Sequence, residues 1–371
     1  RIDTVRHLLS TLFRQSVQEY ARVCSYNLTR ILENGQFLQL SRVLQNGRIT
    51  QKFQFAFSTG KWGFSAHGEH REGVVQVLTT INDSSVASHL RRINTNINRD
   101  GAQLGPRQIH PSTYRILCCA ETPEGKSCGL IKSLAQFCHI RHAHTVSSIE
   151  TALRRMLHIT PWLGHTTHVR LNGRILGYVT GSVMEVYTVL RTQRRQHSLP
   201  YDVELVCETN CGAVHVWCDG GGPMAPLLRA DQVHQARVIL TSVSVPLQWS
   251  ELLRQGCVEY MGVQEASQEW MLIAATMADC TSDHTHLEIH PTSQFGMNAA
   301  CIPFPEYNQA PRNIYATVMT KQALPNRETV CGGVAATEIQ PELQLPLTRT
   351  ETYLASPLRH SPLGVNVMLG I

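Results

Sequence analysis

The sequence predicts an α+β protein of several domains. Apolar residues recur at helical spacing near the start of the chain, at Val5, Leu8 and Leu12, whereas residues 146–285 are dominated by short alternating strand patterns between Asn-Gly and Gly-Gly-Gly turns. Helices and strands are therefore grouped rather than strictly alternating, as in α+β architectures. With 371 residues, 42% of them hydrophobic, the chain can bury two or three cores.

Four consecutive parts follow from these patterns. We expect a helix over 1–45. The part 46–145 begins with the strand-like alternation ITQKFQFAF and continues with a helical GVVQVLTTINDSSVASHLRR and a basic loop. The part 146–285 carries the strands THVRLNGRILGYV, DVELVC and AVHVWCD, with one helix at SELLRQG. The part 286–371 contains a helix near Pro311 and ends in the alternation GVNVMLGI.

Basic residues are clustered rather than evenly mixed. The formal net charge is +5, and one cluster places Arg91, Arg92, Arg99 and Arg107 around a single acid, Asp100. A second cluster, RTQRRQH, follows in the third part. Clustered cations favour a polyanion because they neutralise phosphates and release counterions. A solvated helix face is the alternative for either cluster.

No segment predicts a membrane partner or an exported chain. The longest apolar stretches, such as Met271–Ala278, fall well short of the roughly 20 residues that cross a bilayer. The chain opens at Arg1 directly inside a helical pattern, so we expect a fragment of a longer protein.

The twelve cysteines lack the paired CxxC spacing of zinc ribbons, and most are expected to be buried thiols. The sharpest metal candidate is HTHLEIHP, where strand alternation would place His284, His286, Glu288 and His290 on one face. The alternative is a polar strand face without a metal.

The segment NQAPRNIYATVMTKQAL predicts a helix with an unusual face. Pro311 is tolerated in a first helical turn. Arg312, Tyr315, Met319 and Gln322 then share one stripe at helical spacing. A core-facing stripe would be apolar throughout, so this face favours a polar ligand, and an arginine at a helix start favours phosphate. Pairing of Arg312 with a structural carboxylate is the alternative.

Four runs, in this order, resemble the second-largest subunit of multisubunit DNA-directed RNA polymerases, in its eukaryotic polymerase II-like form or that of large DNA viruses. They are SHLRRINTNINRDG, PRQIHPSTYRILCCAETPEGKSCGLIKSL, WSELLRQGCVEY and HLEIHPTSQFGMNAACIPFPEYNQAPRNIYATVMTKQA. The resemblance covers nearly the whole chain and a third of such a subunit. It implies this layout: the end of the protrusion (1–61), the fork (62–141), external 1 (142–245), external 2 (246–285) and the start of the hybrid-binding domain (286–371).

The resemblance also implies roles for single residues. Arg312 matches an arginine that approaches the phosphates of the incoming nucleoside triphosphate, and Arg107 matches one close to the nucleotide site. Lys321 and Gln322 match residues beside the RNA 3′ end and the RNA–DNA hybrid. No role is implied for the histidines of HTHLEIH.

Two loops are assigned by the same resemblance. Arg99 and Asp100, with Gly101, match a fork loop at the downstream edge of the DNA bubble, where we expect them to tune strand separation rather than chemistry. The loop AETPEG lies beside the active centre in the family, without thiol chemistry. Glu121 and Glu124 would orient neighbouring cations there. Cys119 and Asn96 stand where the family commonly has proline.

The implied reaction is nucleotidyl transfer by two Mg²⁺ ions, held mainly by the largest subunit and by residues outside this chain. The implied partners are that subunit, the smaller polymerase subunits, the DNA template, the RNA–DNA hybrid and nucleoside triphosphates. The implied location is the nucleus, or a cytoplasmic viral factory or virion for a viral protein. An independent nucleic-acid-binding module and a metal-dependent hydrolase built on HTHLEIH are the rival functions.

Overall fold

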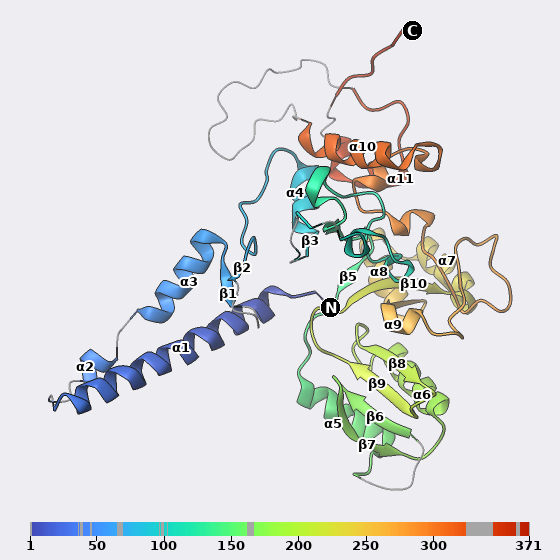
Figure 1. Ribbon diagram of the computed structural model, residues 1–371. Coiled ribbons are helices and arrows are strands. Elements are labelled where there is room, and N and C mark those ends of the chain that lie inside the picture. The colour runs from blue at the N-terminus through green and yellow to red at the C-terminus, as the bar shows by residue number, and fades with distance from the viewer. Residues whose placement is uncertain are drawn as a thin grey trace. The chain divides into compact units, whose positions relative to one another are not determined.

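The computed structural model describes residues 2–35, 37, 40–44, 47–64, 70–95, 97, 100–101, 103–161, 167–323, 344–360 and 364–370. The chain divides into two units. The smaller comprises Asp3–Thr79 and Asn96–Asn98, and the larger comprises Arg1–Ile2, Thr80–Thr95 and Arg99–Ile371. Both contain helices and strands, which confirms the α+β class (Figure 1).

The smaller unit is mainly helical, and its opening helix is confirmed. Its elements are α1 (Val5–Glu33), α2 (Leu40–Val43), α3 (Arg48–Thr59), β1 (Trp62–Phe64) and β2 (His70–Arg71). Leu12, Ala56 and Trp62 form the buried centre between α1, α3 and the β1–β2 ribbon. The indole of Trp62 donates a hydrogen bond to the carbonyl of Leu8 at 3.0 Å, so the ribbon is fastened to α1.

The strand expected over ITQKFQFAF is wrong, because these residues form helix α3. Gly47 and Gly60 have φ values of +90° and +71° and end the helix on either side, a conformation that glycine adopts without strain. Phe53 and Ala56, three residues apart, pack into the core against α1. Phe55 and Phe57 are 49% and 52% exposed. The alternating phenylalanines therefore resemble a strand pattern, although they lie on a helix that buries only one of its faces.

A four-stranded sheet with two helices forms one part of the larger unit. The elements are α5 (Val146–Leu157), β6 (Thr167–Leu171), β7 (Arg174–Val179), α6 (Val183–Arg195), β8 (Glu204–Glu208) and β9 (Ala213–Trp217). The order is β7-β6-β9-β8, with β6 and β9 parallel and the other pairs antiparallel. Leu153 and Leu190 from the helices meet Val214 in one fully buried core. The strands are confirmed, but both helices were missed, although Ser182 and Glu185 form a capping box.

A second sheet follows, built from short strands. Its elements are β5 (His139–Ile140), β10 (Pro223–Arg229), β11 (Val258–Gly262), β12 (Ile273–Ala274) and β13 (His286–Leu287), with α7 (Val233–Ser242), α8 (Val245–Arg254) and α9 (Val263–Ala266). The order is β11-β10-β13-β12, and β5 also pairs with β10. Ile239 of α7 and Leu252 of α8 share a core with Val258. Helix α8 confirms the helix expected at SELLRQG.

The remaining elements position the candidate site. They are α4 (Asp83–Leu90), β3 (Arg92–Asn94), β4 (Ile131–Ser133), α10 (Ala310–Gln322) and α11 (Glu351–Ala355). The helix near Pro311 is confirmed as α10, which packs against α4. The helix expected over 73–92 is only partly right, because Asn82 caps α4 and residues 73–82 are not helical. No strand forms within 364–370, where alternation suggested one.

Within the described ranges, the model holds no helix with both the length and the apolar character needed to cross a bilayer.

Candidate functional site

The exposed stripe of α10 is the centre of the candidate site. Arg312, Tyr315, Met319 and Gln322 are all exposed and lie on one side of the helix. The guanidinium carbon of Arg312 lies 5.7 Å from the centroid of the Tyr315 ring, a cation–π distance. The stripe is therefore not a core face, and it leaves a cation and an aromatic ring exposed.

Polar contacts on the opposite face fix the start of α10. The amide of buried Asn313 donates to the carbonyl of Pro305 at 2.8 Å and accepts from the amide of Asn308 at 3.0 Å. Arg312 belongs to the first turn, where its own N–H donates to the carbonyl of Gln309 at 2.9 Å. Its side chain thus adds positive charge at the positive end of the helix dipole, an arrangement that suits a phosphate.

The opposite end of α10 is joined to the start of α4 by one side chain, that of Asn82. The Asn82 amide oxygen accepts from the Ser85 N–H at 2.7 Å and caps α4. The amide nitrogen donates to the carbonyls of Thr320 and Ala323 at 2.9 and 2.6 Å, and so satisfies the end of α10. This residue, which the sequence analysis did not single out, orients α10 relative to α4.

Lys321 points toward the AETPEG loop. Its ammonium lies 3.3 Å from an oxygen of Glu121, whose side chain is 3% exposed. The expectation that Glu121 orients a neighbouring cation matches this ion pair. Gln322, the next residue, is exposed.

The AETPEG loop is backbone architecture rather than a thiol site. The buried Cys118 sulfur accepts from the N–H groups of Ala120 and Glu121 at 3.4 and 3.2 Å. Burial raises the pKa of Cys118 to about 11, so the thiol stays protonated at neutral pH and is a poor nucleophile. Gly125 has a φ of +75°, a left-handed conformation that glycine adopts in a turn without strain.

Arg107 braces the same loop. Its guanidinium donates to the carbonyls of Lys126 and Cys128 at 2.6 and 2.9 Å, and to that of Gly101 at 3.4 Å. Asp100 forms an exposed ion pair with Lys126 at 2.7 Å. Arg107 and Asp100 are therefore both tied to residues 126–128. Arg99 lies outside the described residues.

Glu124 is exposed, and within the described ranges nothing donates a hydrogen bond to its carboxylate. No described cation is oriented by Glu124, unlike the arrangement at Glu121.

The metal site considered at HTHLEIHP is wrong. Glu288 pairs with Arg115 at 3.3 Å, and His290 lies 3.2 Å from Glu351. His284 contacts the Thr281 hydroxyl at 2.8 Å, and His286 lies 3.3 Å from the Arg191 guanidinium, so the four side chains have separate partners. The described part of the chain contains no group of three potential metal ligands. The two Mg²⁺ ions implied by the resemblance therefore have no matching donor set among these residues, and we assign no step through a metal to them.

The basic cluster RTQRRQH is not a phosphate-binding surface, contrary to the polyanion interpretation. Arg194 is 3% exposed and lies 2.6 Å from Glu265 and 3.1 Å from Glu259. Arg191 and Arg195 contact Glu259 at 3.2 and 2.5 Å. Burial alone would raise the pKa of Glu259, but these three arginines outweigh it and hold that pKa below its usual range. The cluster is a buried ion-pair network that joins α6 to β11 and α9.

His286 lies against Arg191 of this network, and its protonation in acid is expected to lower the stability of the folded chain. Burial lowers the pKa of His286 to about 3, from the ordinary histidine value of 6.5. Between these values the unfolded chain binds a proton that the folded chain does not, so stability falls as pH falls. We expect a loss of about 1.6 kcal/mol in the free energy of unfolding between pH 6.5 and 5, because the histidine of the unfolded chain is already half protonated at pH 6.5 and a full proton is worth roughly 1.36 kcal/mol per pH unit.

Urea unfolding of the chain and of His286→Gln at both pH values measures this loss. The variant should lose most of that pH dependence. An equally steep dependence in both proteins would contradict the assignment.

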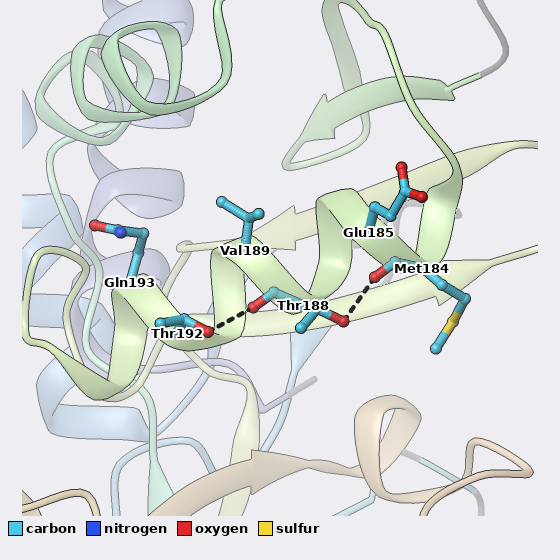
Figure 2. A pocket seen from close by; sticks show the side chains of 6 residues that line it. All are labelled: Met184, Glu185, Thr188, Val189, Thr192 and Gln193. Carbon is cyan, nitrogen blue, oxygen red and sulfur yellow. Dashed lines mark hydrogen bonds between the residues drawn. The ribbon is translucent and has the colours of Figure 1, made fainter.

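A hollow of about 510 Å³ lies on the outer side of α6, far in sequence from α10. Figure 2 shows that all six residues lining it come from this one helix. The hydroxyls of Thr188 and Thr192 donate to the carbonyls of Met184 and Thr188, so they are used within the helix. The hollow therefore brings together no reactive groups.

Comparison with known proteins identifies the class. Residues 76–140 match the family model described as RNA polymerase Rpb2, domain 3, and residues 169–231 match RNA polymerase Rpb2, domain 4. The chain is 30% identical over 404 residues to the DNA-directed RNA polymerase II subunit RPB2 of Encephalitozoon cuniculi. It is 31% identical over 401 residues to the DNA-directed RNA polymerase II subunit 2 of Arabidopsis thaliana. It is 29% identical over 402 residues to the DNA-directed RNA polymerase subunit Rpo2 of Sulfolobus acidocaldarius.

The three alignments cover 100% of this chain and 34%, 33% and 34% of the relatives, so the chain spans about a third of their length. These relatives are named as subunits of DNA-directed RNA polymerases. The matches to domains 3 and 4 of Rpb2, together with these alignments, confirm the resemblance to the polymerase subunit family.

Proposed function

We propose that the chain is part of the second-largest subunit of a DNA-directed RNA polymerase and contributes nucleotide-phosphate, hybrid and fork-loop contacts to RNA synthesis. The exposed Arg312 in the first turn of α10 carries this proposal. The alignment of the whole chain with polymerase subunits supports it. A guanidinium fork at a helix start can bind the triphosphate and stabilise charge that develops on the leaving pyrophosphate.

The other site residues divide into two groups. Lys321 and Gln322, which lie roughly 14 Å along α10 from Arg312, would contact the RNA–DNA hybrid beside the RNA 3′ end. Arg107, with Glu124, would shape the loop beside the nucleotide, and Arg99 and Asp100 would act at the fork of the DNA. None of these roles needs proton transfer, so the contribution of the chain is electrostatic and positional.

The proposed partners are the largest and smaller polymerase subunits, the DNA template, the RNA–DNA hybrid and nucleoside triphosphates. Magnesium would be held by the largest subunit and by residues outside this chain. The similarity to RNA polymerase II subunits of eukaryotes supports a nuclear location.

A reconstitution experiment tests the proposal. Template-directed incorporation is expected from the full subunit assembled with its partners, and none from the purified 371-residue chain with magnesium and nucleotides, because the chain lacks a metal-binding set among its described residues. Incorporation by the chain alone would contradict the proposal. So would tight nucleic-acid binding by the chain alone with a steep salt dependence, which indicates an independent binding module.

A further inference from the structure

One oxygen of Glu121 collects three donors from segments far apart in the sequence. The Ser88 hydroxyl of α4 donates to Oε1 at 2.6 Å, the Asn298 amide at 3.2 Å and the Lys321 ammonium at 3.3 Å. The carboxylate is 3% exposed, so these bonds hold it in one orientation. The Ser84 hydroxyl fixes the Asn298 amide in turn, at 2.5 Å from Oδ1.

The second carboxylate oxygen of Glu121, Oε2, is confined by its close approach to Gly296. A Cβ at Gly296 would lie 2.9 Å from Oε2, so only glycine leaves the room that the carboxylate occupies. The position of the carboxylate is therefore set on both sides, and the position of Lys321 follows from it.

The Glu121–Lys321 pair gives Lys321 a different character from Arg312. The Lys321 side chain is 15% exposed and its charge is balanced by Glu121. An ammonium has three donors, and one of them is directed to Glu121. Arg312 is exposed, and no carboxylate among the described residues pairs with it. Arg312 thus offers net charge, whereas Lys321 offers hydrogen bonds of fixed direction.

We propose that Glu121 is a positioning residue, which holds the Lys321 ammonium so that its remaining N–H donors face a phosphate or ribose oxygen of the bound nucleic acid. The inference rests on the proposed function, because it presumes that Lys321 contacts nucleic acid. A free lysine stem would lose rotamer entropy on binding. Fixing it beforehand removes that cost and keeps the donors aligned.

The test is single-nucleotide addition by the assembled polymerase carrying Glu121→Gln. Glutamine keeps the volume and an acceptor oxygen for Ser88 and Asn298, but it loses the charge that holds Lys321. We expect addition to slow about tenfold to a hundredfold, the scale of a misplaced group in an active site. Lys321→Met should lose a similar factor, and the double variant no more than Lys321→Met alone. Glu121→Asp should recover part of the rate.

Glu306→Gln, at an exposed carboxylate just before α10, is the matched control and should add nucleotides normally.

The outcomes separate the inference from the function on which it rests. If Lys321→Met is slow but Glu121→Gln is normal, the positioning role is overturned and the proposed function stands. If Lys321→Met and Arg312→Ala both add nucleotides normally in assembled enzyme, the proposed function itself fails. If the double variant is slower than Lys321→Met alone by the full factor that Glu121→Gln costs, Glu121 has a merely structural role and the inference is overturned. Should Glu121→Gln not assemble, Ser88→Ala loosens the carboxylate without removing its charge. The slower addition caused by Ser88→Ala must then be absent when Lys321 is already replaced by methionine.

Discussion

Replacement of Arg312 by alanine is expected to slow single-nucleotide addition by the assembled polymerase about a hundred- to a thousandfold. Loss of one preorganised donor at a site of developing charge typically costs roughly 2.7–4 kcal/mol. Arg312 meets the conditions for such a role, since it is exposed, lies in the first turn of α10 and has its guanidinium over Tyr315. The measurement is rapid-quench addition of one nucleotide, with assembly checked separately.

Two further variants sharpen this test. Arg312→Lys should recover only part of the rate, because a point charge cannot reproduce a bidentate fork. Arg237→Ala, at an exposed arginine of α7, removes an equal charge away from α10 and should leave addition unchanged. A fully assembled Arg312→Ala enzyme with normal addition would refute the assignment.

Replacement of Arg194 by methionine is expected to lower the free energy of unfolding by about 3–5 kcal/mol. Arg194 lies between Glu265 and Glu259, both buried, and its loss leaves Glu265 as an uncompensated charge in the interior. Urea unfolding of the 371-residue chain at neutral pH measures the effect.

The charge imbalance, rather than lost packing, should account for most of this cost. A double replacement, Arg194→Met with Glu265→Leu, should therefore recover much of it, because a well-packed apolar pair often replaces a buried ion pair without loss. Arg155→Met, at an exposed position of α5, is the control for the substitution itself and should change stability little. Equal losses in the single and double variants would point to packing instead.

Local patterns predicted the elements whose burial follows a single period. Strand β6, in which every second residue is buried, and the helix at Pro311, with its exposed polar stripe, are of this kind. The strand expected in place of helix α3 was wrong because three alternating phenylalanines do not reveal that Phe53 is partly buried against the core and Phe55 is exposed. The missed N-cap of α4 was readable, because Asn82 is a preferred capping residue.

Some features of the candidate site could likewise be predicted from the sequence, and others could not. The stripe led by Arg312 could be found from helical spacing, and its polymerase role remains a prediction that resemblance supplied. The partners of charged side chains could not be found, because Glu121 and Lys321 are 200 residues apart and Arg194 and Glu265 are 71 apart. Sequence proximity made RTQRRQH resemble an exposed basic patch, whereas the acids that neutralise it come from β11 and α9.

The Asn82 amide makes hydrogen bonds to both α4 and α10, and this limits where the chain can accept inserted residues. Asn82 and Thr320 are 238 residues apart, yet the bond between them fixes the start of α4 against the end of α10. The chain between them is a closed loop whose ends meet at one side chain. Residues inserted within that loop, at surface turns of its two sheets, can enlarge it without moving Arg312. Alignments of this 371-residue chain with its relatives run to 401 and 431 positions, so the relatives carry additional residues. We expect insertions at such turns to be tolerated, and even a single residue added between Asn82 and Ser85 to displace α10.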